Sequence, residues 1–476
     1  MRLIKEMLRS FYQPGKKEKN NKMIFRRKIF HQDKNNEVLK IISFGGFGNV
    51  TQNLFVYEYQ GQLLMIDCGV GFVEKLHRKT ELVVPDFNYL LQNQDKIKAI
   101  IFTHGHEDHI AGLPFFLTKV KKPIPIYASR WSAALIEEKL EEYHLHAKIN
   151  IVDSQSHLDL GPFKIDFVFI THSIPDSYHL VIRTPVGLVY HGSDFKFDWT
   201  PVTGKQSEVG KIAQFGHEGV TLLLSDCLRS ENAGYTLSEQ MIEESFEREI
   251  RDCRGKFFVT TMSSNVSRWQ QALNVIAAHR RRAVVVGRSV EKVVSIAVRL
   301  GYLKLPPGVV IPLKKAGGFL PQQLAFLISG SQAQSGSALE KVVRGEHRQI
   351  KIKPGDKVVF STDYIPGNEI AIHHLIDRLS YLGADVSYSE ISDDIHVSGH
   401  GAQADLALLI SLTRPKWLLP IGGAFRQMKQ YALLAQRMGF EEKQILLPEK
   451  SQTIELRADG QVRFGPKITL HPQFVV

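Results

Sequence analysis

The segment AIIFTHGHEDH, residues 99–109, carries the densest structural signal in the chain. Its first four residues are apolar and predict a buried β-strand, which leads within two residues into three histidines and two acids. The following segment, 110–119, predicts a helix. Because ligand sites in open α/β sheets lie beyond the carboxyl ends of the strands, we expect a functional site at this strand-to-helix turn.

This polar turn has the residue types and spacing of a metal site. Alternate side chains of a turn converge, so His104 and His106 can bind one divalent ion, while Asp108 and His109 can reach a second. Zinc favours imidazole nitrogen with carboxylate oxygen, and catalytic zinc sites keep a position open for water. A solvated polar turn is the alternative, but so many ligand-type residues after an apolar strand favour metal binding.

Two further candidates also follow apolar strands. His172 comes after the run 167–170 and Asp194 after the run 188–190, so His172 can complete the first ligand set and Asp194 can bridge both ions. Two ions that share a water suit phosphodiester hydrolysis, for which His400, at a glycine turn, is the candidate proton donor. A structural turn histidine is the alternative interpretation of His400.

Composition narrows the class of protein. The chain has 476 residues, is 43% hydrophobic, and contains no apolar run of 18 residues and no secretory signal, so we expect a cytoplasmic protein without stable membrane insertion. Its three scattered cysteines do not form a disulfide framework or a four-cysteine zinc site. We expect Cys68, Cys227 and Cys253 to be reduced thiols, mostly buried.

The formal charge of +11 is concentrated at the N-terminus, where residues 1–36 hold 11 basic side chains and three acidic ones. We expect 1–36 to be a disordered basic arm that binds nucleic acid through salt-sensitive phosphate contacts. Adhesion to a membrane surface and a solubilising tail are the alternatives.

The rest of the chain predicts an interrupted domain. Residues 206–362 alternate β and α segments, with helices expected over 238–252, 267–279, 290–300 and 321–328, and are interpreted as an inserted α/β domain. The flanking segments 37–205 and 363–450 then form one domain, and 451–476 is a short C-terminal segment. The sequence ends soon after Pro466, so we expect no separate C-terminal domain.

At this point the residues resemble a known family. The HxHxDH signature at 104–109, with Asp67, His172 and Asp194, resembles the metallo-β-lactamase superfamily, and the insert resembles its nucleic-acid-processing β-CASP branch. Within that branch the chain is similar to the ribonuclease J family over about residues 38–445. The matching segments are THGHEDHIAGLP (103–114), THSIPDSYHLVIRTPVGLVYHGSDFKFD (171–198), SDCLRSENAGYTLSE (225–239), SSNVSRWQQ (263–271), GRSVE (287–291), IPGNE (365–369) and DDIHVSGHGAQADL (393–406).

The resemblance implies an αββα sandwich with an inserted α/β β-CASP domain, two Zn²⁺ sites with Mn²⁺ as an alternative, and RNA as the substrate. It implies 5′-to-3′ exonuclease and, in some cases, endonuclease activity in RNA processing and decay, in a homodimer or a hetero-oligomer with a related nuclease. By resemblance, Asp67 orients the metal-binding loop, Asp226 holds His400, and Asp108 belongs to the catalytic set. His396, Ser398 and Gly399 lie where the family binds the phosphate of a 5′-terminal nucleotide.

Two segments depart from the family pattern. The family's last metal-ligand motif, Pro-Val-His-Gly-Glu-Tyr-Arg, is here PIGGAFR (420–426), so Gly422 replaces the histidine and Ala424 the glutamate. Asp108, His109 and Asp194 would remain for the second ion, which we expect to bind more weakly than the first. GSQAQS (330–335) stands where the family usually has Gly-Glu-Pro after the glutamine.

These departures leave alternatives to an active ribonuclease with an adjusted metal site. The chain could be a catalytically weak RNA-binding paralogue, or a partner subunit of an active ribonuclease J. A small-molecule hydrolase of the same superfamily is disfavoured by the inserted domain and the basic arm. We favour the ribonuclease because the ligand-type residues and His400 are retained.

Overall fold

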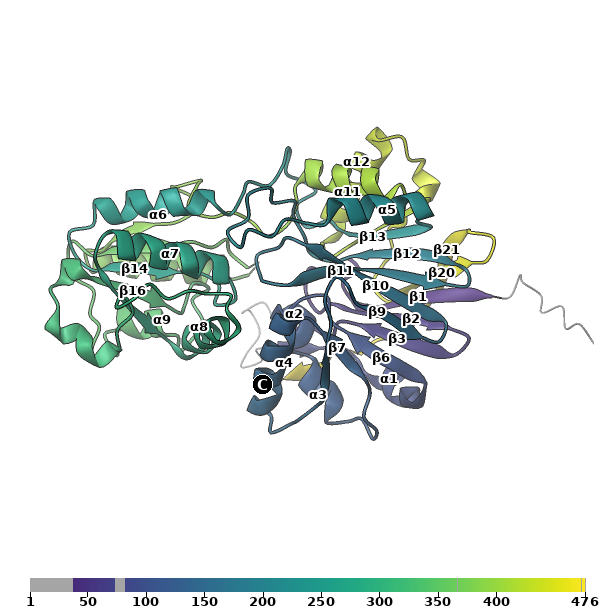
Figure 1. Ribbon diagram of the computed structural model, residues 1–476, viewed down its shortest axis with the longest axis horizontal. Helices are drawn as coiled ribbons and strands as arrows, with labels where there is room; N and C mark the ends of the chain where they lie inside the picture. Colours follow the sequence, from purple (N-terminus) through teal and green to yellow (C-terminus); the bar gives the residue numbers. More distant parts are fainter. Residues whose placement is uncertain (1–36, 73–81, 366, 472, 476) are drawn as a thin grey trace, which may run out of the picture. The chain divides into compact units, whose positions relative to one another are not determined.

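The structure is a computed structural model that describes residues 37–72, 82–365, 367–471 and 473–475 (Figure 1). The expected arm, 1–36, lies outside the described residues. Asn35–Val476 forms one compact unit. Among the described helices, none has the length and apolar character needed to span a membrane.

Two sheets form the centre of this unit. The larger sheet has the order β21-β20-β1-β2-β3-β6-β7-β8, and the smaller has the order β19-β13-β12-β11-β10-β9. The strands of the larger sheet are β1 Val38–Gly45, β2 Leu54–Tyr59, β3 Gln62–Ile66, β6 Ile97–Ile101, β7 Ile126–Ala128, β8 Ile149–Ile151, β20 Gln452–Arg457 and β21 Val462–Lys467. Those of the smaller sheet are β9 His157–Leu160, β10 Phe163–Ile170, β11 Ser177–Thr184, β12 Gly187–Gly192, β13 Leu222–Asp226 and β19 Trp417–Ile421.

The two sheets pack face to face, and helices cover their outer faces. Ile41 and Tyr57 of the larger sheet share one buried core with Phe167 and Leu180 of the smaller. The outer face of the larger sheet packs against α1 (Asn88–Gln92), α3 (Leu113–Leu117) and α4 (Arg130–Glu142). The outer face of the smaller sheet packs against α5 (Val209–Glu218), α11 (Gln403–Thr413) and α12 (Phe425–Arg437). This is the αββα sandwich that the family resemblance implied.

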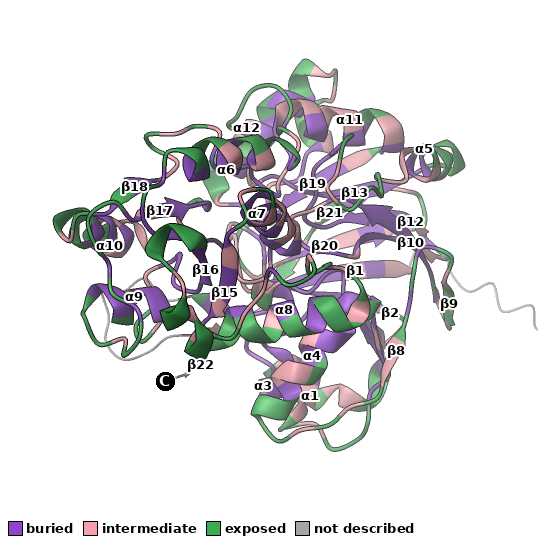
Figure 2. Ribbon diagram, turned by 60° about the vertical axis from the view of Figure 1, so that its left-hand side comes forward, coloured by how far each residue is buried: buried purple, intermediate pink, exposed green. Residues whose placement is uncertain are grey.

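A third sheet, all parallel, forms the inserted part, with strand order β15-β16-β14-β17-β18. Its strands are β14 Phe257–Thr260, β15 Arg282–Val286, β16 Leu324–Ile328, β17 Lys357–Phe360 and β18 Asp385–Ser387. One core contains side chains of α6 (Met241–Arg251), α7 (Val266–Ala278) and α8 (Arg288–Leu300), and another those of α9 (Ala338–Val343) and α10 (Glu369–Tyr381). Helices on both faces explain why these strands are mostly apolar, and Figure 2 shows them largely buried.

The inserted part both begins and ends later in the chain than the 206–362 expected from the sequence. α5 and β13 belong to the sandwich, because β13 pairs in parallel with β12 and β19. α10 and β18 lie beyond 362 and belong to the five-stranded part. The predicted helix at 321–328 was also wrong, since Leu324–Ile328 is β16, while α6, α7 and α8 confirm the other three.

The segment 451–476 completes the sandwich. β20 pairs with β1, and β21 continues the sheet beyond it. A separate three-stranded sheet joins β22 (Gln473–Val475) to β5 (Leu82–Val84) and β4 (Gly71–Phe72).

Candidate metal centre

Several strands of the sandwich end at the same place, and polar side chains follow them. β6 leads into the turn at 104–106 and then α2 (Glu107–Ile110), and β10 leads to His172. Asp194 follows β12, and Asp226 is the last residue of β13. Both sheets therefore supply side chains to one site.

The first cluster consists of His104, His106, His172 and Asp194, whose candidate ligand atoms all lie within 4.8 Å of one another. His106 Nδ1 is 3.1 Å from His104 Nε2 and 3.1 Å from His172 Nε2. Asp194 Oδ2 is 3.7 Å from His104 Nε2 and 3.9 Å from His172 Nε2. Four ligands around a tetrahedral zinc ion lie roughly 3.3 Å apart, so these atoms fit a divalent ion.

Burial keeps the first cluster's imidazoles neutral, as metal ligands must be. It lowers the pKa of His104 and His172 well below the ordinary value, and that of His106 to about 3. A ring that is neutral at physiological pH has a free lone pair on the nitrogen facing the cluster.

The second cluster consists of Asp108, His109 and Asp194. His109 Nε2 is 3.4 Å from Asp194 Oδ2 and 3.6 Å from Asp108 Oδ2. Burial disfavours a charged His109 ring, but the surrounding carboxylates outweigh it and raise the pKa of His109 well above its ordinary value. The second cluster therefore attracts positive charge, and Asp194 belongs to both clusters.

Asp67 fixes the orientation of the His109 ring. His109 Nδ1 lies 2.8 Å from Asp67 Oδ2, and Asp67 also accepts hydrogen bonds from the Thr103 N–H and hydroxyl, each at 2.8 Å. This contact leaves Nε2 of His109 facing the cluster. The geometry supports the orienting role that the family resemblance implied for Asp67.

His400 and Asp226 lie at the side of both clusters. His400 Nδ1 is 2.7 Å from Asp226 Oδ2, and its Nε2 is 3.9 Å from Asp194 Oδ2. Burial would lower the pKa of His400, but Asp226 and Asp194 raise it to about 9. The ring is thus held with a proton on Nε2, beside the candidate metal ligands.

Comparison with known proteins adds a second line of evidence. Residues 254–379 match the family profile described as "Ribonuclease J, beta-CASP domain", and residues 47–198 match the metallo-beta-lactamase superfamily. The ribonuclease J of Synechocystis sp. is 40% identical over 437 residues, which cover 90% of this chain and 68% of the relative. The chain belongs to the ribonuclease J family.

A second ribonuclease J and one solved structure are also similar to this chain. Ribonuclease J 1 of Streptococcus pyogenes is 36% identical and covers 90% of this chain and 76% of its own. Among solved structures, a protein of unknown function from Enterococcus faecalis V583 aligns with a TM-score of 0.60 and 13% identity, over 88% of this chain and 100% of its own, and so shares the fold.

Gly422 lies beside Asp194 and Asp226, at the edge of the site. It follows β19 with φ +66°, and its N–H donates to the Gly46 carbonyl at 3.0 Å. A Cβ atom here would lie 3.8 Å from both Asp194 Oδ1 and Asp226 Oδ1. A side chain at position 422 would therefore lie against these two carboxylates.

Of the residues predicted to bind a 5′-phosphate, Gly399 contacts the first cluster directly. Gly399 O accepts a hydrogen bond from His172 Nδ1 at 2.7 Å, and Ser398 Oγ accepts from the His400 N–H at 3.2 Å. His396 Nδ1 accepts from the guanidinium of Arg268 at 2.7 Å. A Cβ at Gly399 would lie 2.7 Å from the Ser173 side chain, so only glycine fits there.

Sequence reasoning missed two residues at this site. Arg268 is fully buried and paired with Glu239 at 2.6 Å, and its place in SSNVSRWQQ was the only signal. The side chain of Asn53 lies 3.2 Å from Asp108 Oδ2, and nothing in the local sequence pointed to it.

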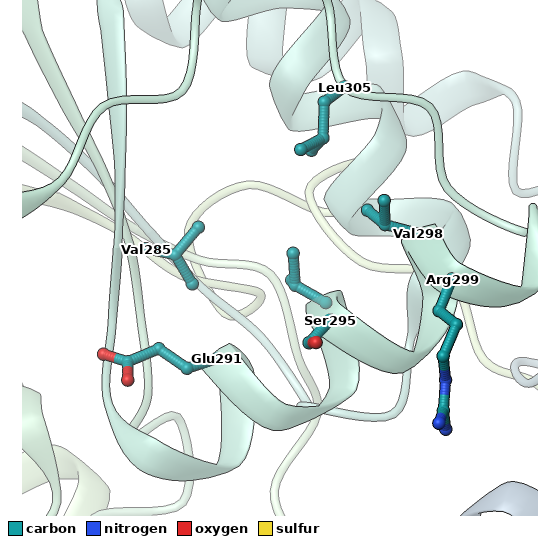
Figure 3. A pocket seen from close by; sticks show the side chains of 7 residues that line it. Val285, Glu291, Ser295, Val298, Arg299 and Leu305 are labelled. Atoms are coloured by element: carbon teal, nitrogen blue, oxygen red, sulfur yellow. The ribbon is translucent and has the colours of Figure 1, made fainter.

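A separate shallow hollow of about 430 Å³ lies on the inserted part, along α8 (Figure 3). None of its lining residues belongs to the clusters. They are Val285, Glu291, Val294, Ser295, Val298, Arg299 and Leu305.

Proposed function

We propose that this chain is a metal-dependent ribonuclease that hydrolyses RNA phosphodiester bonds in cytoplasmic RNA processing and decay. The observation that carries the proposal is the convergence of His104, His106, His172 and Asp194 within 4.8 Å, in a member of the ribonuclease J family. The proposed reaction is 5′-to-3′ exonucleolytic, with endonucleolytic cleavage as a second mode. Its proposed partners are RNA and, for assembly, a second copy or a related nuclease.

The first cluster is proposed to hold Zn²⁺ and the second cluster a further divalent ion, Zn²⁺ or Mn²⁺. Ions bound there supply an activated water at neutral pH and neutralise charge on the transferring phosphoryl group. The neutral, buried imidazoles of His104, His106 and His172 bind the first ion, and Asp194 serves both. Asp108 and His109 bind the second.

His400 is proposed to protonate the leaving oxygen. Asp226 fixes the ring through Nδ1, so that Nε2–H faces the clusters. Because the pKa of His400 is raised to about 9, the ring keeps its proton at neutral pH.

The phosphate at the 5′ end is proposed to bind at His396, Ser398 and Gly399. Because His396 Nδ1 accepts a hydrogen bond from Arg268, the ring proton lies on Nε2. That nitrogen can donate to a phosphate oxygen.

The direct test is product mapping on 5′-monophosphorylated RNA labelled at either end, with added Zn²⁺ or Mn²⁺. We expect mononucleotides released from the 5′ end, and internal fragments if the second mode operates. RNA that stays intact through prolonged incubation with both metals would refute the proposal.

Gly422 is the one observation that supports the second candidate, a catalytically weak partner subunit. Gly422→His should raise the affinity of the second cluster for its ion by about tenfold and raise turnover. The positive φ strains any side chain by roughly 1–2 kcal/mol. Gly422→Ala is the matched control, because it carries the same strain without the imidazole.

Metal affinity by calorimetry and turnover on RNA check this prediction. Equal metal binding in Gly422→His and Gly422→Ala would mean that position 422 does not serve the second cluster. Higher metal affinity without higher turnover would favour the weak partner subunit.

A further inference from the structure

Asn53 is a buried amide at the edge of the second cluster. It directly precedes β2 and is 2% exposed. Its N–H donates to the Asp108 carbonyl at 2.9 Å, and its carbonyl accepts from the Gly69 N–H at 2.9 Å. The backbone of Asn53 is therefore fixed to the turn that carries Asp108.

The side-chain amide of Asn53 lies close to Asp108 and His109, two expected ligands of the second ion. Its Nδ2 atom is 3.0 Å from His109 Nε2 and 3.2 Å from Asp108 Oδ2. Ligand atoms of one ion with bonds of about 2.1 Å lie roughly 3.0–3.4 Å apart in octahedral or tetrahedral geometry. The terminal amide atom thus fits the same coordination sphere as Asp108 and His109.

A half-turn of the amide would place Oδ1 in that position. The amide nitrogen and oxygen occupy nearly the same shape, so only hydrogen bonding distinguishes the two orientations. Outside the cluster, Nδ2 makes one long hydrogen bond, to the Val50 carbonyl at 3.3 Å. Turning the amide toward an ion would give up this hydrogen bond and place Oδ1 near the Val50 carbonyl oxygen, so the new bond to the ion has to offset that contact.

Asn53 and Gly422 both lie close to Gly46. The Gly46 carbonyl accepts the Gly422 N–H at 3.0 Å, and Asn53 Oδ1 is 2.9 Å from where a Cβ at Gly46 would stand. Asn53 and Gly422 thus flank the same glycine turn. The amide is the uncharged polar side chain that contacts both Asp108 and His109.

We propose that Asn53 is a ligand of the second ion through Oδ1, and that this added oxygen strengthens the binding of Mn²⁺ at the second site. The set would then contain oxygens from Asp108, Asp194 and Asn53 and one imidazole nitrogen. Oxygen-rich sets suit Mn²⁺, whereas the three imidazoles of the first cluster suit Zn²⁺. The inference rests on the two-ion site of the proposed function.

The test loads metal-free protein with one equivalent of Zn²⁺ and then titrates Mn²⁺, with free Mn²⁺ followed by electron paramagnetic resonance. Wild type should bind one equivalent of Mn²⁺. Asn53→Leu should bind it at least about tenfold more weakly. Asn53→Asp, which keeps an oxygen in place, should bind within about threefold of wild type or more tightly.

Two controls separate coordination from charge and from folding. Asn49→Asp adds the same charge to the same loop and should leave Mn²⁺ affinity within about twofold, since the Asn49 side chain accepts a hydrogen bond from the Thr51 N–H at 3.5 Å and not from a ligand-type residue of the second cluster. Retention of the Zn²⁺ equivalent and an unchanged melting profile show that each variant is folded.

Two results would overturn the inference. Asn53→Leu could bind Mn²⁺ as wild type does, or Asn53→Asp could be as weak as Asn53→Leu. The second result would make the amide a hydrogen-bond donor to Asp108. Normal Mn²⁺ binding without RNA hydrolysis would count against the proposed function alone.

Discussion

His106→Ala should remove the ion from the first cluster and lower kcat/KM on RNA by about 10³-fold or more, about 4 kcal/mol of transition-state stabilisation. His106 Nδ1 lies 3.1 Å from the facing nitrogens of both His104 and His172, so its loss opens the centre of the ligand set. Elemental analysis and single-turnover RNA cleavage measure the two effects.

Glu107→Gln is the matched control for this variant. Glu107 belongs to the same polar turn, but its carboxylate is 57% exposed and pairs with Lys139 at 3.0 Å. The Glu107→Gln variant should keep the metal and an activity within about twofold of wild type. Equal losses in the two variants would point to a damaged turn, and metal retained by His106→Ala would remove His106 from the ligand set.

His400→Ala should lower kcat by 10²–10⁴-fold, the usual range for a lost general acid, while the metal content stays unchanged. The loss of kcat in His400→Ala should be much smaller on RNA with a bridging phosphorothiolate at the cleaved bond, because a leaving sulfur needs no proton. Asp226→Asn should lie between this variant and wild type, since Asp226 is one of the carboxylates that raise the pKa of His400.

Metal analysis and single-turnover kinetics on both substrates check this prediction. If His400→Ala is as impaired on the phosphorothiolate as on ordinary RNA, His400 is not the proton donor. Loss of metal in His400→Ala would instead make it part of the metal site.

The first cluster could be predicted because its signal is local. His104 and His106 lie in one short turn, and His172 and Asp194 each follow an apolar strand, so the strand ends alone indicated where they meet. The αββα sandwich followed from the family resemblance.

What the sequence did not reveal depends on long-range packing. The run at 324–328 is apolar at every position and fully buried in β16, so it has no periodicity that distinguishes a strand from a helix. β13 could not be assigned to the sandwich, because its partners β12 and β19 are set by the completed sheet. Asn53 and Arg268 are single polar residues whose contacts come from distant parts of the chain.

The most direct measurement is anomalous diffraction from crystals of the zinc-loaded protein. We predict a peak bound by His104 Nε2, His106 Nδ1, His172 Nε2 and Asp194 Oδ2, each at about 2.0–2.2 Å. A zinc peak elsewhere, or none within bonding distance of these four atoms, would contradict the account.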